Sequence, residues 1–192
     1  MSSILLSGPA VEPVALDDAK AFLKVETADD DDVIAALIAG ARVHVEAQTR
    51  RALITQSWRL IRDAWPDDGR LAIMPVPLVA LTAARIYNLD GTTQAIDPAS
   101  FVVEKAAAPA VLAFGASPPL APGRVVAGIE LDITAGYGDT AEDVPADLRQ
   151  AIRILVAHWY ENRGLIATGA ATVALLPQTV AALIAPHRVL SL

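Results

Sequence analysis

The sequence predicts an α+β fold, and three observations lead to this prediction. Residues 16–50 contain two stretches in which apolar residues recur at helical spacing, and residues 145–163 contain a third. Between them, residues 53–135 carry short β-favouring segments separated by Pro and Gly turns. We therefore expect N-terminal helices, a compact antiparallel β region, a long C-terminal helix and an extended tail.

The N-terminal region is expected to form an irregular arm followed by a short helix. Residues 1–12 show no regular period. The segment from Leu16 to Lys24 reads LDDAKAFLK, which is typical of a helix, and Asp17 or Asp18 is placed to cap its first turn. The first helix should therefore begin near Leu16.

Four consecutive aspartates, Asp29 to Asp32, precede a longer helix that should end near Arg50. A calcium loop spaces its oxygen ligands at alternate positions around a glycine turn, and this run does not. Aspartates before an amphipathic helix more often cap its free N–H groups and interact favourably with the helix dipole. We therefore interpret the run as a helix start. The apolar stripe of this helix is expected to comprise Ile34, Leu37, Ile38, Ala41 and Val45.

The middle of the chain alternates short strands with turns. Pro66-Asp67-Asp68-Gly69 and Asp90-Gly91 are the clearest turn signals, and the second is typical of a hairpin. Pro75 and Pro77 should end the strand before them, because Pro has no N–H for the ladder. Strand pairing stays open, because residues 106–123 form an insert rich in Ala and Pro. The expected strands are Leu53–Asp63, Leu71–Ile73, Leu81–Asn88, Thr92–Ile96, Phe101–Glu104 and Val111–Phe114.

The segment from Ile129 to Arg163 joins a strand, a turn and a helix. Apolar and polar residues alternate from Ile129 to Ile133, and Gly136-Tyr137-Gly138 then breaks the strand. Pro145 suits the first position of a helix, where its missing N–H costs nothing, and Gly164 can close that helix. The buried face of the helix is expected to comprise Leu148, Ile152, Leu155, Val156 and Trp159.

Composition excludes several classes of function. The chain of 192 residues has no cysteine, which rules out disulfides, thiolate zinc sites and cysteine nucleophiles. Its formal net charge is −7 and Arg50-Arg51 is the only basic doublet, so a basic DNA-binding patch is not expected. No apolar run is long enough to cross a bilayer, and the N-terminus does not have the pattern of a signal peptide.

No catalytic, cofactor or metal site is expected from the motifs. His44, His158 and His187 have no second ligand at a zinc spacing, and His158 with Glu161 is best interpreted as a surface pair on a helix. Gly136-Tyr137-Gly138 lacks the third glycine of a dinucleotide fingerprint. The tryptophans are expected to pack in the core or at interfaces. We therefore predict that the chain is not an enzyme. An enzyme whose active site is assembled from dispersed residues is the least favoured alternative.

The C-terminal tail is the candidate functional region. Residues 165–174 are small and apolar without a period, and Pro177 to Ala185 could form a short helix that stops at Pro186. Apolar residues in such a tail often bind a partner, and Arg is over-represented at interface hot spots. A tail that folds back on its own domain is an equal alternative. The candidate interface residues are Pro186, His187, Arg188, Val189, Leu190 and Leu192.

Three blocks of the sequence resemble the HK97-type phage head–tail connector (adaptor) family, whose members occur in tailed phages, prophages and gene transfer agents. The blocks are Pro13–Leu60, Ile133–Arg163 and Leu176–Val189. The second is the most specific, because a strand ending in T-A-G-Y-G precedes a V-P-x-x-L-R-Q helix that ends in H-W-Y-E-N-R. The insert of residues 106–123 departs most from the family pattern.

The resemblance implies a structural protein of the virion neck, made in the bacterial cytoplasm and without cofactors. Family members form a homo-oligomeric ring, commonly of twelve copies, beneath the capsid portal. The ring continues the DNA channel and presents a surface to the next neck or tail protein. For this chain the resemblance implies a single α+β adaptor domain over residues 1–164, a docking tail over residues 165–192, and a portal contact at Pro186 to Leu192.

DNA is expected to pass through such a ring without sequence-specific binding, and no membrane is involved. The net charge of −7 suggests an acidic ring that repels the DNA backbone and discourages sticking. A channel lined mainly by Arg50, Arg51, Arg59 and Arg62 would contradict this hypothesis. The alternative function is a small prophage-derived regulatory or ligand-binding module.

Overall fold

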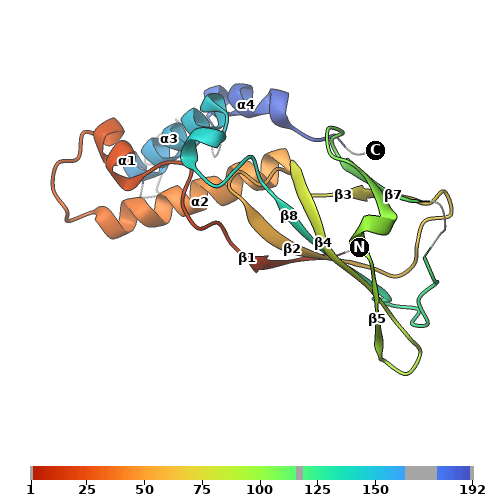
Figure 1. Ribbon diagram of the computed structural model, residues 1–192. Helices are drawn as coiled ribbons and strands as arrows, with labels where there is room; N and C mark the ends of the chain where they lie inside the picture. The colour runs from red at the N-terminus through yellow and green to blue at the C-terminus, as the bar shows by residue number, and fades with distance from the viewer. Residues whose placement is uncertain (1, 116–118, 163–176, 191–192) are drawn as a thin grey trace, which may run out of the picture. The chain divides into compact units, whose positions relative to one another are not determined.

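The computed structural model describes residues 2–115, 119–162 and 177–190, and the chain divides into two compact units (Figure 1). One, whose described residues form strands, turns and loops, is called the β unit; the other contains the helices and is called the helical unit. Helices and antiparallel sheets are both present, which confirms the α+β class. The β unit comprises Met1–Ala10, Thr55–Tyr137 and Val189–Leu192; the helical unit comprises Val11–Ile54 and Gly138–Arg188.

A five-stranded antiparallel sheet forms the larger part of the β unit (Figure 1). The central strand β8 is flanked by β2 and β4, in register at Leu60, Leu131 and Ala84. Every second residue of β8 is buried, as the predicted alternation requires. The strands, in sheet order, are β1 (Ser2–Ser7), β2 (Gln56–Arg62), β8 (Ile129–Ala135), β4 (Leu78–Tyr87) and β5 (Thr93–Ile96).

The N-terminal arm is a strand, so the prediction of an irregular arm over residues 1–12 is wrong. β1 pairs with β2, with Ser3 opposite Leu60 and Leu5 opposite Trp58. All residues of β1 are exposed on both faces of the sheet. A strand without a buried face needs no alternation of apolar and polar residues, which is why the periodicity of the sequence did not indicate it.

A smaller sheet of three antiparallel strands completes the β unit. It has the order β3 (Arg70–Ile73), β7 (Ala110–Phe114) and β6 (Phe101–Glu104). The 3₁₀ turn η1 (Pro98–Ser100) precedes β6. Trp65 packs against this sheet, with its ring centroid 5.4 Å from that of Phe114 and 5.9 Å from that of Phe101. The predicted strands are therefore confirmed, and the structure supplies the pairing that the sequence left open.

The described residues of the helical unit form four helices and two 3₁₀ turns (Figure 1). The predicted helices are present within a few residues of their expected bounds. The elements are α1 (Leu16–Leu23), α2 (Asp31–Thr49), η2 (Ala141–Asp143), α3 (Ala146–Glu161), α4 (Gln178–Ile184) and η3 (Ala185–His187). Their shared core is formed by Ile34, Ile38, Ala41, Val45, Leu148, Ala151, Ile152, Leu155, Val156, Val180 and Ile184.

Three details of the helical predictions need correction. The N-cap residues are Ala15 in α1 and Asp30 in α2, and neither makes a side-chain cap hydrogen bond, so the predicted caps are not present; the first turns instead hold the acidic residues Asp17, Asp18, Asp31 and Asp32. The predicted helix over residues 145–163 is α3, which begins one residue after Pro145. The last helix of the chain is instead the seven-residue α4, so the C-terminal helix is short. Gly164 and residues 165–174 lie outside the described part.

The described tail is folded rather than extended. Val180 and Ile184 of α4 are fully buried, because they fill the space beside α3 and α2. These contacts stabilise a helix that is too short to be stable alone in water. The tail from Pro177 to Arg188 therefore belongs to the helical unit.

Candidate functional site

The predicted interface residues lie just after α4, and the structure separates them into exposed and buried groups. Pro186 and Arg188 are exposed, and Leu190 keeps 85% of its surface exposed. His187 is half-buried, whereas Val189 is only 5% exposed and is not available to a partner in this conformation. Leu192 lies outside the described residues. We call residues 186–190 the C-terminal motif.

Three side chains of the helical unit hold the C-terminal motif. His187 Nε2 lies 2.6 Å from Asp147 Oδ2. Because a carboxylate only accepts hydrogen bonds, this nitrogen must carry the hydrogen. Arg51 Nε donates to the carbonyl oxygen of His187 at 2.7 Å, and Arg188 Nη2 donates to Gln48 Oε1 at 3.0 Å. His187 and Arg188 are therefore held at the C-terminal end of α2 and at the first turn of α3.

Two prolines and an acidic residue explain this local structure. Pro177 immediately precedes α4, and Pro186 lies in the 3₁₀ turn η3 that follows it. The chain then becomes extended at Arg188. Asp147 lies in the first turn of α3, where the helix dipole favours a negative charge. Partial burial raises the pKa of Asp147, but the hydrogen bond and charge of His187 outweigh it and leave that pKa below its usual value.

Sequence reasoning missed the partners of the C-terminal motif. Gln48, Arg51 and Asp147 have no motif of their own, and Arg51 and Asp147 are more than thirty residues from His187 along the chain. The one available signal was Asp147 itself, an acidic residue two positions after Pro145 in the first turn of the helix, which could have indicated a cationic partner. Only the fold shows that the partner of Asp147 is His187.

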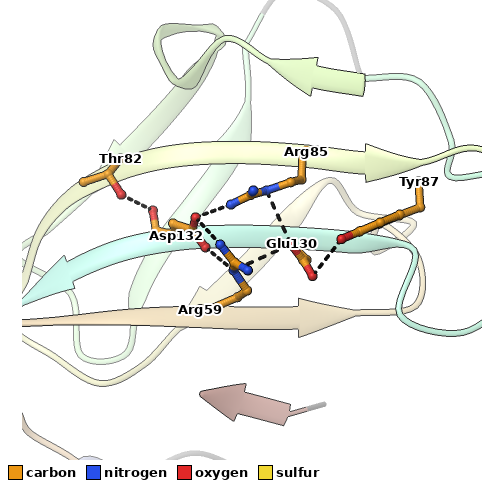
Figure 2. A network of polar contacts seen from close by, with 6 residues as sticks. All are labelled: Arg59, Thr82, Arg85, Tyr87, Glu130 and Asp132. Carbon is orange, nitrogen blue, oxygen red and sulfur yellow. Dashed lines mark hydrogen bonds and ion pairs between the residues drawn. The ribbon is translucent and has the colours of Figure 1, made fainter. Parts of the chain in front are cut away.

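A second polar cluster crosses the five-stranded sheet, and we call it the sheet network (Figure 2). Arg59 on β2 and Arg85 on β4 converge on Asp132 of β8 from its two sides. The guanidinium group of Arg59 donates two hydrogen bonds to the Asp132 carboxylate, from Nε to Oδ1 at 2.7 Å and from Nη2 to Oδ2 at 2.9 Å. Glu130 lies 3.6 Å from Arg59 Nε and 3.4 Å from Arg85 Nε.

Two hydroxyl groups complete the sheet network. Tyr87 donates to Glu130 Oε1 at 3.1 Å, and Thr82 donates to the carbonyl oxygen of Asp132 at 2.9 Å (Figure 2). The bidentate hydrogen bond from Arg59 is the main reason that the pKa of Asp132 is below its usual value. A carboxylate held in its charged form does not exchange protons near neutral pH, so this cluster ties strands together and is poorly suited to acid–base catalysis.

The remaining candidate residues have packing contacts. The ring of His44 meets that of Trp159 edge to face, with centroids 5.9 Å apart. Asn162 donates to the carbonyl oxygen of His158 at 2.7 Å. Across residues 2–115, 119–162 and 177–190, no group of three or more His, Asp or Glu side chains could hold a metal ion. Within the same ranges, no helix is long and apolar enough to cross a membrane.

A DNA channel lined by Arg50, Arg51, Arg59 and Arg62 would contradict the acidic-ring hypothesis. The side chains of three of them bind protein groups. Arg51 binds the His187 carbonyl group, and Arg59 is paired with Asp132. Arg62 is buried, and its Nη1 donates to the carbonyl oxygen of Ile61 at 2.8 Å. These contacts leave less of their charge available to a polyanion.

Comparison with known proteins gives one family and several solved structures. The model of the phage gp6-like head-tail connector protein family matches residues 13–101 and 124–188. A chain from the neck of an empty gene transfer agent (GTA) particle, computed with C6 symmetry, is 27% identical. That match covers 100% of this chain and 97% of the other, with a TM-score of 0.84. No curated protein matches the sequence at a significant level.

Two further structures are similar. A chain from the neck of a native GTA particle, computed with C12 symmetry, is 30% identical and has a TM-score of 0.71, with 98% of this chain and 97% of the other covered. A chain from the virion of a native GTA particle is 23% identical with a TM-score of 0.81, with coverage of 100% and 97%, and this likeness shows the fold alone.

Proposed function

Because the chain belongs to the phage gp6-like head-tail connector protein family, and is thus a structural virion protein of the head–tail junction, we propose that it forms a ring that joins the capsid portal to the tail. The observation that carries the proposal is the family match, which extends over the helical unit and through Arg188 of the C-terminal motif. The similar chains come from GTA necks whose structures were computed with C6 and C12 symmetry, which supports a cyclic assembly.

The C-terminal motif is the proposed portal contact. Arg51 holds the backbone carbonyl group of His187 and Asp147 holds its side chain, so this residue would lose little conformational entropy when a partner binds. Leu190 is an exposed aliphatic anchor next to the cationic Arg188. Val189 joins the contact only if the end of the chain rearranges, because it is buried here. Leu192 remains a proposed contact residue on the basis of the resemblance alone.

The proposed organisation separates scaffold from docking tail. Residues 1–164 would act as one adaptor domain and residues 165–192 as the tail that docks. The ring would leave a central passage for DNA, which the net charge of −7 keeps from adhering. The role requires no reaction, and we infer that the chain is not an enzyme. A downstream neck or tail protein would bind the face of the ring opposite the portal.

The portal contact can be tested by one exposed substitution. Leu190→Asp places a charge at a position that is 85% exposed, so the fold should be unchanged while portal binding is lost. Leu89→Asp is the matched control, since Leu89 is 86% exposed and lies outside the motif. Binding to purified portal rings would be measured by sedimentation and folding by circular dichroism. Equal portal binding by both variants would refute the assignment of the motif.

The family match favours the connector over the alternative of a prophage-derived regulatory or ligand-binding module. The mass of the full chain, measured alone and with portal rings, separates the two functions. A ring, or a complex with the portal, supports the connector. A monomer that is indifferent to the portal supports the module.

A further inference from the structure

The five-stranded sheet ends in two open edges. In the part of the chain that the structure describes, β1 pairs only with β2, and β5 pairs only with β4 (Figure 1). All residues of β1 are exposed, and so are Thr93, Gln94 and Ala95 of β5. The N–H and C=O groups on the outer side of each edge strand are therefore free to pair with another strand.

Neither edge carries the charged side chains or the prolines that often prevent strand pairing, although β5 has only four residues and β1 has a register irregularity between Leu5 and Ser7. Proteins protect an exposed edge with charged side chains, particularly Lys, or with Pro. The sequence of β1 is SSILLS and that of β5 is TQAI, so both lack charge and Pro. In addition, Ile4, Leu5 and Leu6 are 49%, 47% and 47% exposed, which leaves three adjacent aliphatic side chains in water. An exposed apolar edge of this kind is typical of a surface that accepts a strand.

We propose that β1 of one copy pairs with β5 of the next copy, so that the sheets of neighbouring copies in the ring become continuous. This inference rests on the ring proposed above. A cyclic ring requires each subunit to present two different surfaces that are complementary to one another. A sheet with one open edge on each side presents such a pair, which identifies the occupant of each edge as a second copy of this chain.

The strand directions make the proposal more specific. Each neighbouring pair of strands in the sheet is antiparallel, so β1 and β5 run in the same direction. Rotation by a twelvefold axis changes a strand's direction only slightly from one copy to the next. β5 and the neighbouring β1 should therefore form a parallel pair. A dimer made by β1 alone would be antiparallel and could not extend beyond two copies.

Side-chain faces provide the test. Ser3 and Leu5 are opposite Leu60 and Trp58, and Gln94 is opposite Ile86. The ladder through β8 places these residues on one face of the sheet. In a continuous sheet, cysteines at Ser3 or Leu5 should meet a cysteine at Gln94 of the next copy. Two β1 positions are used, because a disulfide forms only when Cβ atoms are about 3.5–4.5 Å apart, and positions two residues apart sample two registers.

The experiment uses the full chain, which has no cysteine of its own, at a concentration where it is assembled. Ser3→Cys/Gln94→Cys and Leu5→Cys/Gln94→Cys are oxidised and separated on non-reducing gels. At least one pair should give a covalent ladder that extends beyond the dimer. The matched control replaces Gln94→Cys with Ala95→Cys, which is on the same strand but on the opposite face, and should give at least tenfold less ladder. On the same gels, each variant with a single cysteine should run as a monomer.

Each other outcome has a defined meaning. Rings without a ladder overturn the strand pairing but leave the ring intact. Efficient dimers from Ser3→Cys or Leu5→Cys alone show that β1 pairs with itself, which also overturns the proposal. A chain that stays monomeric at every concentration, with and without portal rings, overturns both the strand pairing and the ring.

Discussion

Arg59 and Asp132 lie directly opposite each other on β2 and β8, and the guanidinium group binds both carboxylate oxygens, at 2.7 Å and 2.9 Å. Because the side chains of the pair keep 28% and 14% of their surface exposed, the pair is only partly screened by water. Arg85 reaches the same carboxylate from β4. A single residue on the central strand therefore joins three strands through its side chain.

Asp132→Asn should destabilise the protein by about 1–3 kcal/mol at pH 7, because two arginines lose their shared charged acceptor. Urea unfolding would measure the loss. Thr134→Ala changes the next residue on the same face of β8 and should cost less. Equal losses would show that the charge of Asp132 contributes nothing beyond its place in the strand.

The contribution of Asp132 should depend on pH in a definite direction. Its pKa is lowered in the folded protein, chiefly by the hydrogen bond from Arg59, while the unfolded value is about 3.9. The stabilisation is therefore complete above that unfolded value and is lost as the pH falls through the lowered folded value. The difference in unfolding free energy between wild type and Asp132→Asn should shrink below about pH 4. A difference that persists at pH 2 contradicts this origin.

His187 and Asp147 should be coupled weakly but measurably. Asp147 keeps 39% of its side-chain surface exposed, so water screens the pair and a double-mutant cycle of His187→Ala and Asp147→Ala should give about 0.5 kcal/mol. The local effect should be larger. Hydrogen exchange should increase over residues 177–190 in either variant and stay unchanged over Ala146–Glu161. Faster exchange throughout α3 would mean that the pair holds the helix rather than the tail.

The core of α3 supplies the largest single effect. Leu155 is fully buried, and Leu155→Ala should cost about 2–5 kcal/mol through lost burial and the cavity left behind. Leu155→Asp should be worse, because it buries a charge without a partner. Val43→Ala on α2 is the control: Val43 is 55% exposed, and its change should stay within about 0.5 kcal/mol. Thermal unfolding distinguishes these values. A melting temperature unchanged by Leu155→Asp would show that Leu155 does not lie on the buried face of α3.

The sequence predicted those parts of the fold in which burial imposes a period. The alternation of β8 and the apolar face of α3, with Leu148, Ile152 and Leu155, are both confirmed by burial. It did not predict β1, whose exposed faces impose no pattern. It did not predict the contacts of His187 either, because Arg51, which follows α2, and Asp147 of α3 are far from His187 along the chain. The hydrophobic periodicity of a helix or strand can be read from neighbouring residues, whereas the partner of a polar side chain depends on which distant segments the fold brings together.

The turn Gly136-Tyr137-Gly138 gives the last prediction. A Cβ atom added to Gly138 would come 2.6 Å from the Cβ atom of Asp143 and closer still to its carboxylate. That carboxylate cannot easily move, because Oδ2 accepts hydrogen bonds from both the amide and the hydroxyl group of Thr140, each at 2.9 Å. Gly138→Ala should therefore cost about 1–3 kcal/mol.

A second substitution tests the cause of that cost. Asp143→Gly removes the obstructing side chain, so Gly138→Ala should be cheaper in that background by at least about 0.5 kcal/mol. Gly8→Ala is the control, because an added Cβ would meet only Leu5 at an ordinary 3.9 Å. Chemical denaturation of the four variants and wild type completes the cycle. The same cost for Gly138→Ala in both backgrounds would show that the turn needs glycine for its backbone rather than for the space occupied by Asp143.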